Sequence, residues 1–462
     1  MQEELSAPRP VASARRPRVL LVAEAANPEF VSVPLVGWSQ AKALRALVDG
    51  HLVTQVRNRE AILRAGWHEG ADFTALDTEH VAAPLHKVGT LLTGRKGRGW
   101  TTLTALQAFA YYAFERALWR RFGAEIRAGA YDVVHRITPL SPTIPSLLAS
   151  RCKRAGVPFV IGPLNGGVPW PKGFDFVRRR EREWLSYVRD AYKLLPGHRA
   201  TRRDAAAILV ASRDTLEQMP KSARERCFYL PENAIDPERF PVPAPRAWEA
   251  PLRAVFVGRL VPYKGADMLL DAAAPLLARG AMTLDVVGDG PERAPLEARA
   301  KELGVARGLV FHGWVEHRAV QEHYARAHVF AFPSVREFGG GVVLEAMALG
   351  AVPVVLDYGG PAELVTPNTG FLLPMADRAG VVASLRATLE RLAADPGALE
   401  PLSASALRRA REQFTWSAKA ECVVELYRWL LDRSLPRPEF PMPLPELAPA
   451  GLQGGPRNGQ NA

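Results

Sequence analysis

Short apolar runs alternate with longer stretches of helical pattern along most of the chain. The runs begin at residues 19–23 and recur at 51–56, 131–135, 158–164, 207–212, 252–260, 284–290, 309–314, 329–334, 352–356 and 370–374. A continuous apolar run bounded by turn residues is typical of a buried parallel strand. The intervening sequence, such as residues 39–47, favours helices. This βα repeat predicts α/β architecture, with parallel sheets covered by helices on both faces.

One proline-rich segment, residues 233–251, interrupts the periodicity and predicts a linker between two domains. We place the first Rossmann-like domain at 17–240, the linker at 241–251, the second such domain at 252–415 and a last helix at 416–435. Residues 1–16 and 436–462 have the composition of disordered ends. In doubly wound sheets, ligands lie at the carboxyl ends of the strands. We therefore expect the site in a deep cleft between two facing domains.

Residues 332–355 combine a strand end, a glycine-rich turn, a helix and a second strand. Glu337 and Glu345 are eight positions apart, with Gly339, Gly340 and Gly341 between them. Glycines at a helix N-terminus let backbone N–H groups approach an anion such as phosphate. Two carboxylates beside it could accept hydrogen bonds from sugar hydroxyls. The alternative is an ordinary α/β crossover with two solvated glutamates.

A second candidate lies in residues 256–270, at the start of the second domain. Gly258 and Arg259 end a strand, and Lys264 and Gly265 precede a helix. Arg binds phosphate oxygens as a fork and Lys as a point charge, so the pair suits a diphosphate. Two solvated surface cations are the alternative.

These motifs together resemble the retaining glycosyltransferases of family 4, which have the GT-B fold of two facing Rossmann-like domains. The glycine-rich stretch is similar to that family's E-G-F-G-x-x-x-L-E-A-M-A-x-G signature, although a small residue after Glu337 is missing. The second candidate matches its G-R-x-x-x-x-K-G motif in full. Further similar segments lie at 286–293, 311–315 and 357–372, in the family's order.

The resemblance implies a role for each matched residue. Arg259 and Lys264 would bind the donor diphosphate and, with Glu337, make up the catalytic set. Glu345 would bind the ribose, and Gly258 would support the phosphate loop. The remaining implied donor contacts are Phe338, Gly339, Gly340 and Gly341 at the hexose, and Gly313, Trp314 and Val315 at the base. A core position is the alternative for Trp314.

The resemblance is weaker in the first domain, where the family binds the acceptor. Gly37 stands near the place of the family's glycine pair, and His135 ends a strand that would face the cleft. We expect both on the acceptor side. For His135 the alternative is a histidine whose hydrogen bonds are satisfied within the protein.

The implied activity is transfer of a hexose from a UDP- or GDP-linked sugar to a glycan or lipid-linked acceptor, in cell-surface polysaccharide or glycolipid synthesis. The nucleotide-diphosphate sugar is a co-substrate, and we expect no other cofactor. The sequence has no cluster of Asp or His with ligand spacing, so we expect metal-independent transfer with retention of configuration. A GT-B nucleotide-sugar epimerase and a non-catalytic sugar- or nucleic-acid-binding module are the rival interpretations.

Charge adds an expectation about partners. The 462 residues carry a net charge of +11, which favours a negatively charged partner. Basic and aromatic residues mix at 94–100 and 176–204 and suit an anionic membrane surface, with a solvated helix as the alternative. No nucleic-acid fold signature accompanies the charge. Three scattered cysteines and the absence of a signal peptide or an apolar span predict a cytoplasmic protein, peripheral at most on the inner membrane face.

Overall fold

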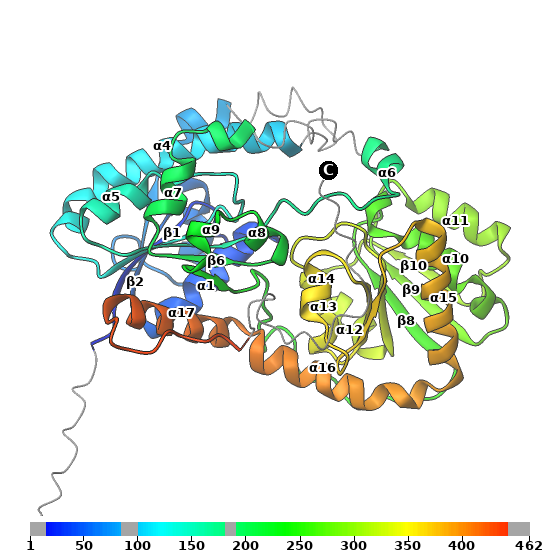
Figure 1. Ribbon diagram of the computed structural model, residues 1–462. Helices are drawn as coiled ribbons and strands as arrows, with labels where there is room; N and C mark the ends of the chain where they lie inside the picture. The colour runs from blue at the N-terminus through cyan, green and yellow to red at the C-terminus, as the bar shows by residue number, and fades with distance from the viewer. Residues whose placement is uncertain (1–14, 85–99, 181–190, 442–462) are drawn as a thin grey trace, which may run out of the picture.

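The computed structural model describes residues 15–84, 100–180 and 191–441, which form two parallel β-sheets (Figure 1). The first sheet has the strand order β3-β2-β1-β4-β5-β6-β7, and the second has the order β10-β9-β8-β11-β12-β13. Both are doubly wound, because the chain starts at a central strand and builds outward to each side in turn. The predicted α/β architecture with two Rossmann-like units is confirmed.

The strands coincide with the apolar runs of the sequence. Every residue of β4, β5, β11 and β12 is buried, as expected for central parallel strands covered on both faces. The first sheet consists of β1 (Arg18–Ala23), β2 (Asp49–Gln55), β3 (Phe73–Leu76), β4 (Val133–Thr138), β5 (Phe159–Leu164), β6 (Ala207–Val210) and β7 (Cys227–Tyr229). The second consists of β8 (Leu252–Val257), β9 (Met282–Val287), β10 (Leu309–Gly313), β11 (Val329–Phe332), β12 (Val352–Leu356) and β13 (Phe371–Leu373).

Helices connect successive strands and cover both faces of each sheet. Those of the first domain are α1 (Val33–Leu47), η1 (Val56–Asn58), α2 (Arg59–Arg64), α4 (Trp100–Arg127), α5 (Leu148–Arg154), α6 (Asp175–Arg180), η3 (Ala191–Leu194), α7 (His198–Asp204), α8 (Arg213–Glu217) and α9 (Lys221–Arg224). Those after the linker are η4 (Pro262–Lys264), α10 (Ala266–Ala278), α11 (Arg293–Glu302), α12 (His317–Arg326), α13 (Gly341–Ala348), α14 (Gly359–Leu364), α15 (Arg378–Ala394), η5 (Pro396–Leu399), α16 (Glu400–Gln413) and α17 (Trp416–Leu431). Among these helices, none combines the length and apolar character needed to cross a bilayer.

The strand order reverses beside β1 in the first sheet and beside β8 in the second. β1 pairs with β2 and β4, and β8 pairs with β9 and β11, all in parallel. Ligands of doubly wound sheets bind beyond the carboxyl ends of the strands at such a reversal. The loops that follow β1, β4, β8 and β11 are therefore the places to look for a site.

The chain passes between the domains twice, and the two crossings are bonded together. The backbone N–H of Ile235 donates to the carbonyl of Phe414 at 2.8 Å. Beyond this point α17 returns to the first domain and packs on α1 (Figure 1). The buried ammonium of Lys419 in α17 donates to the carbonyl oxygens of Pro231 and Asn233. The C-terminal helix thus completes the first domain.

His135 and Tyr427 join that helix to the core of the first domain. The His135 ring is fully buried, with Nδ1 at 2.5 Å from the Tyr427 hydroxyl and Nε2 at 2.8 Å from the Gly162 carbonyl oxygen. Burial lowers the pKa of His135 to about 4. This is the geometry of a histidine satisfied within the protein, the alternative to a contact with the acceptor.

We expect Tyr427→Phe to lower the free energy of unfolding by about 1–3 kcal/mol, because it leaves a buried imidazole nitrogen without its partner. Urea denaturation would measure the change. Tyr192→Phe removes a hydroxyl from a half-buried tyrosine and serves as the control. Equal stability of the two variants would contradict the assignment of a bonded core histidine.

The predicted ends are described only in part. Arg15 pairs with Asp132 at 2.9 Å, and the ring of Phe440 packs on Phe228 at 5.7 Å between centroids. Residues 1–14 and 442–462 lie outside the described residues, as do 94–99 and 181–190 of the two basic stretches.

Candidate functional site

Two loops of the second domain meet at the carboxyl ends of β8 and β11. The backbone N–H of Val335 donates to the Tyr263 carbonyl at 2.9 Å, and the Ser334 hydroxyl donates to the same oxygen at 3.2 Å. Gly265 has φ +75°, and a Cβ there would lie 2.3 Å from the Pro333 carbonyl oxygen. The two sequence candidates, about 75 residues apart in the chain, are thus packed into one structure.

The packing of these loops brings Lys264 onto Glu337. The ammonium of Lys264 contacts the Glu337 carboxylate, and the two side chains are only 15% and 19% exposed. The same ammonium lies 5.1 Å from the centroid of the Phe332 ring, a favourable cation–π distance. Because an ammonium has three donors, one carboxylate does not saturate it, and a phosphate oxygen could share it.

Glycine is required at positions 339 and 340 for two different structural reasons. Gly340 caps α13 with φ +62°, a left-handed conformation that favours glycine. At Gly339 a Cβ would lie 1.8 Å from Oε1 of Glu232, which belongs to the first domain. The first N–H groups of α13 follow directly and are the groups that a helix leaves without intrahelical partners. A close approach of both domains and an anion-binding helix end coincide at this turn.

The other residues that we expect to bind a donor flank this centre. Arg259 is exposed on the loop that also carries Gly258 and Lys264. Glu345 is half-buried in α13, near the fully buried Tyr324, whose pKa is raised first by burial and then by the Glu345 charge. The structure therefore places Arg259, Lys264, Glu337 and Glu345 on adjoining loops and the helix that follows them.

Gly313 ends β10, the edge strand of the second sheet, and Trp314 and Val315 follow it. The backbone N–H of Gly288 donates to the Gly313 carbonyl at 2.8 Å, which joins the ends of β9 and β10. The Trp314 side chain is 78% exposed, so the core alternative is wrong. An exposed indole at a strand end has the surface to stack on a planar ring.

Glu232 was not singled out by the sequence, yet it faces the Glu337 loop from the first domain. Its Oε2 accepts a hydrogen bond from Asn165 Nδ2 at 2.6 Å. Burial raises the pKa of Glu232, and the nearby Glu337 charge adds to the increase. Its segment, residues 230–240, is similar to one of the family's, but the place of the side chain depends on the second domain lying opposite.

Glu363, within one of the segments similar to the family, links the domains. On α14 it accepts hydrogen bonds from the Tyr229 hydroxyl at 2.6 Å and from the Arg213 backbone N–H at 2.8 Å. Burial raises the pKa of Glu363 to about 7 from its ordinary 4.5. The interdomain carboxyl thus changes charge near neutral pH.

We expect Glu363→Gln to flatten the pH dependence of stability between about pH 4.5 and 7. In that window the folded protein holds a proton on Glu363 that the unfolded chain has released, so the free energy of unfolding falls as pH rises. The glutamine mimics the protonated carboxyl and cannot titrate. Urea unfolding at pH 5 and 7.5 tests this, and an undiminished difference between the two pH values would oppose it.

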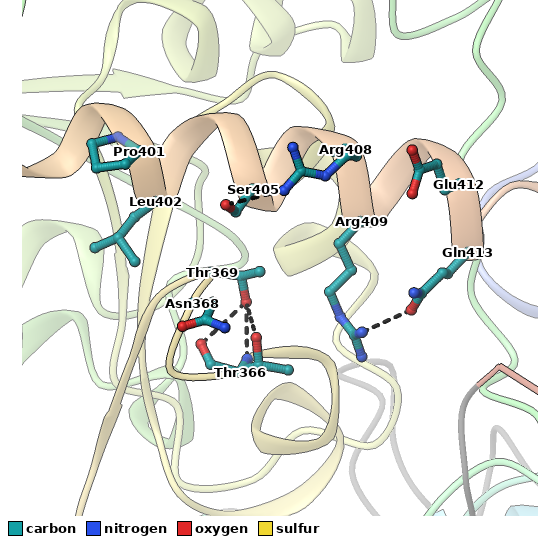
Figure 2. Close-up of a pocket in the computed structure, with 10 residues that line it drawn as sticks. All are labelled: Thr366, Asn368, Thr369, Pro401, Leu402, Ser405, Arg408, Arg409, Glu412 and Gln413. Atoms are coloured by element: carbon teal, nitrogen blue, oxygen red, sulfur yellow. Dashed lines mark hydrogen bonds between the residues drawn. The ribbon is translucent and has the colours of Figure 1, made fainter.

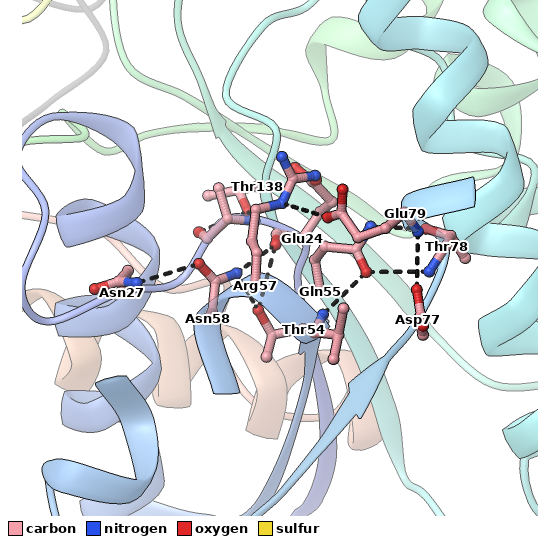
Figure 3. Close-up of polar contacts among 12 residues, drawn as sticks. Glu24, Asn27, Thr54, Gln55, Arg57, Asn58, Asp77, Thr78, Glu79 and Thr138 are labelled. Carbon is pink, nitrogen blue, oxygen red and sulfur yellow. Dashed lines mark hydrogen bonds and ion pairs between the residues drawn. The ribbon is translucent and has the colours of Figure 1, made fainter. Parts of the chain in front are cut away.

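A polar cluster lies at the carboxyl ends of the first-domain strands (Figure 3). Glu24, directly after β1, pairs with Arg57 at 2.6 Å, and Arg57 reaches Glu79 at 3.3 Å. Burial raises the pKa of Glu24, and the positive charge of Arg57 partly offsets this increase. Five further members are buried and form side-chain hydrogen bonds in pairs: Asn27 with Asn58, Asn58 with Thr54, and Gln55 with Thr78. The exposed Asp77 accepts from the Glu79 backbone N–H, and Thr138 donates to the Ala25 carbonyl. This cluster, rather than His135, carries the polar groups of that edge.

Gly37 has a packing role in the same region. It is buried in α1, and a Cβ there would lie 2.1 Å from the Ala25 carbonyl oxygen in the loop after β1. Because this residue has no side chain, α1 can approach the Glu24 loop closely. Gly37 thus helps to position the polar cluster but contributes no polar group to it.

A separate hollow of about 380 Å³ lies between α16 and the turn 366–369 (Figure 2). Its lining is mixed, with Pro401 and Leu402 beside polar residues that include Thr366, Ser405 and Arg409. Arg409 donates to Gln413 at 2.7 Å and to the Leu364 carbonyl at 3.3 Å. The hollow contains none of the residues that the sequence assigned to a donor, so we base the site on the contacts between loops.

Residues 251–391 match the family described as glycosyl transferases group 1. The chain is 32% identical over 198 residues to the glycogen synthase of Mycobacterium tuberculosis, covering 42% of this chain and 47% of that protein. It is 31% identical over 264 residues to a GDP-mannose-dependent alpha-(1-6)-phosphatidylinositol monomannoside mannosyltransferase of Mycolicibacterium smegmatis. That match covers 51% of this chain and 66% of the mannosyltransferase. The chain spans about half the length of the first curated relatives it matches.

Solved structures extend the likeness over both domains. HepE from Anabaena, in complex with UDP, superposes with a TM-score of 0.55 at 16% identity and covers 89% of this chain and 99% of its own. The chain therefore has the GT-B fold, and over residues 251–391 it is similar to the glycosyl transferases of group 1.

Proposed function

We propose that this protein is a retaining glycosyltransferase that moves a hexose from a nucleotide-diphosphate sugar to a glycan or lipid-linked acceptor. The observation that carries the proposal is the contact between Lys264 and Glu337, which joins two motifs into one partly buried site. A cation beside a carboxylate and a helix N-terminus can hold a phosphate and a sugar at adjacent positions.

In this proposal each group acts on the donor. Lys264 and Arg259 bind the diphosphate and stabilise the negative charge that develops as the nucleotide leaves. Glu337 and the backbone N–H groups of the glycine turn orient the hexose hydroxyls, and Glu345 accepts hydrogen bonds from the ribose. The acceptor attacks on the face from which the nucleotide departs, through an oxocarbenium-like state. The proposed transfer uses no metal and no cofactor beyond the sugar nucleotide.

The acceptor binds at the first-domain edge, where Glu24 and Arg57 supply polar groups for hydroxyls. Glycogen synthase and the phosphatidylinositol mannosyltransferase among the relatives support a glycan and a lipid-linked acceptor respectively. HepE with bound UDP supports a nucleotide-linked donor. The setting that we propose is synthesis of cell-surface polysaccharide or glycolipid on the cytoplasmic side of the membrane.

Peripheral membrane docking belongs to the same proposal. Phe176 and Leu194, both within the basic stretch 176–204, are 50% and 87% exposed. Apolar side chains beside a basic segment suit the headgroup region of an anionic bilayer. Flotation with phosphatidylserine vesicles is expected to recover the protein at low salt and to lose it at high salt. Absence of salt-sensitive binding would remove this part of the proposal.

A donor screen tests the proposed function directly. A bound nucleotide raises the apparent stability by about 2.7 kcal/mol at a hundredfold excess over its Kd. We expect UDP- or GDP-sugars to raise the melting temperature, and Glu345→Gln to weaken binding by about 10-fold or more, since it removes a charged acceptor. Lack of any shift across the nucleotide sugars would refute a donor site.

Incubating the protein with the donor found in this screen distinguishes a transferase from the two rival functions. A transferase releases nucleotide and forms a product whose anomeric configuration, read by NMR, equals that of the donor. An epimerase would exchange the sugar configuration without acceptor. A binding module would show the thermal shift with neither reaction.

A further inference from the structure

Three side chains of metal-ligand type converge from separate elements at the edge of the second sheet. Asp285 lies on β9, His312 on β10 and His323 on α12. Each offers one ligand atom, and these atoms all lie within 4.8 Å of one another. All three side chains are half-buried, so an ion among them would be shielded but reachable from solvent.

The contacts among the three already form a compact unit. Asp285 Oδ1 is 2.5 Å from His312 Nε2, and the rings of His312 and His323 are 4.2 Å apart between centroids at an angle of 56°. β9 and β10 are paired neighbours, whereas α12 follows β10 after a short loop. The cluster therefore joins the edge of the sheet to the helix that covers it.

The donor atoms of the cluster suit a cation. Two imidazole nitrogens and one carboxylate oxygen face one another from three elements. A neutral imidazole is the form that binds metal ions. A carboxylate at Asp285 supplies the negative charge that two imidazoles lack.

We propose that Asp285, His312 and His323 form a binding site for a divalent transition-metal ion, best matched by Zn²⁺, which fastens α12 to β9 and β10. Two nitrogens and one oxygen are a donor set that Zn²⁺ accepts, with water at the fourth position. Zn–N and Zn–O distances of about 2.0–2.2 Å at tetrahedral angles place ligand atoms about 3.4 Å apart. Binding therefore requires Asp285 Oδ1 and His312 Nε2 to separate from their present 2.5 Å as the ion displaces the shared proton. Mg²⁺ and Ca²⁺ prefer oxygen ligands, so the site discriminates against them.

This site is separate from the proposed chemistry. None of the three residues is among those assigned to the donor, and His312 directly precedes Gly313, the first residue assigned to the base. The ion is structural. Failure of the donor screen would leave the metal proposal intact, and failure of metal binding would leave the transferase proposal intact.

Calorimetric titration of the full chain, free of any histidine tag and treated with chelator, tests the proposal. We expect saturable binding of Zn²⁺, with a rise in melting temperature, and no such response to Mg²⁺. His323→Ala and Asp285→Asn should each weaken Zn²⁺ binding by about tenfold or more and abolish the thermal shift. His80→Ala, which removes an exposed histidine elsewhere, is the matched control and should bind as the parent does.

Melting in EDTA checks that the variants fold as the parent does. Should a variant fail to fold, the visible spectrum of Co²⁺ bound to the parent protein still decides, because a tetrahedral site with these ligands gives intense absorption. No saturable Zn²⁺ binding, affinity unchanged by both substitutions, or the absence of a tetrahedral Co²⁺ band would each overturn the proposal.

Discussion

Lys264→Ala is expected to reduce donor turnover by about 10²–10³-fold, the usual effect of losing one preorganised charge at a transition state. The ammonium lies where charge would develop on the leaving diphosphate, in a site shielded from water. Because that charge is larger in the transition state than in the bound substrate, the loss should fall on kcat more than on KM. Steady-state kinetics with the donor found by thermal shift would measure it.

Two variants bracket this result. Lys264→Arg keeps the charge but not the compact geometry of an ammonium, so we expect partial activity. Lys301→Ala removes an exposed lysine on α11 and should leave turnover unchanged. Full activity of Lys264→Ala, in a protein with the parent's melting temperature, would rule out the donor-site assignment.

Gly339→Ala is expected to destabilise the contact between the domains by about 1–3 kcal/mol, the usual effect of forcing a methyl group into a filled space. The added Cβ would lie 1.8 Å from Glu232 Oε1 and 2.3 Å from Asn233 Nδ2. Glu232 cannot simply rotate away, because it is buried and bonded to Asn165. Urea unfolding and nucleotide affinity should both deteriorate, since the turn that meets the donor would be displaced.

Gly341→Ala provides the control for the unfolding measurement two residues later, where a Cβ would lie 3.3 Å from Asn233, a much smaller overlap. Adding Glu232→Ala to Gly339→Ala should recover much of the lost stability, because it removes the colliding carboxylate. If Gly341→Ala is equally damaging, or if the double variant shows no recovery, the clash with the first domain is not the cause.

The donor side of the site could be predicted because its motifs are local. Arg259 and Lys264 lie on one loop, and Glu337 and Glu345 lie on one turn and its helix, so each motif is visible within a short stretch. That the two motifs touch follows from parallel strands, whose carboxyl ends meet at one edge of a sheet. The contact between Lys264 and Glu337 agrees with that expectation.

The acceptor side could not be predicted in the same way. His135 has the sequence position of a cleft residue, yet α17, almost 300 residues later, covers it and supplies Tyr427 as its partner. Glu232 lies against the Gly339 turn and Glu363 bonds to Tyr229, each in the opposite domain, and burial raises the pKa of both carboxyls. Asp285, His312 and His323 have no ligand spacing along the chain and converge only through strand pairing and helix packing.

The sequence by itself determined that there are two doubly wound domains, where along the chain their strands lie, and which residues make up the proposed donor motifs. These features depend on periodicity and on short-range backbone needs, such as glycine at the N-terminus of α13. Only the tertiary structure decided which polar groups are buried, which carboxyls are raised in pKa and which histidines meet. Burial and charge–charge contact are properties of neighbours in space, and in this protein those neighbours come from opposite domains or from strands and helices far apart in the chain.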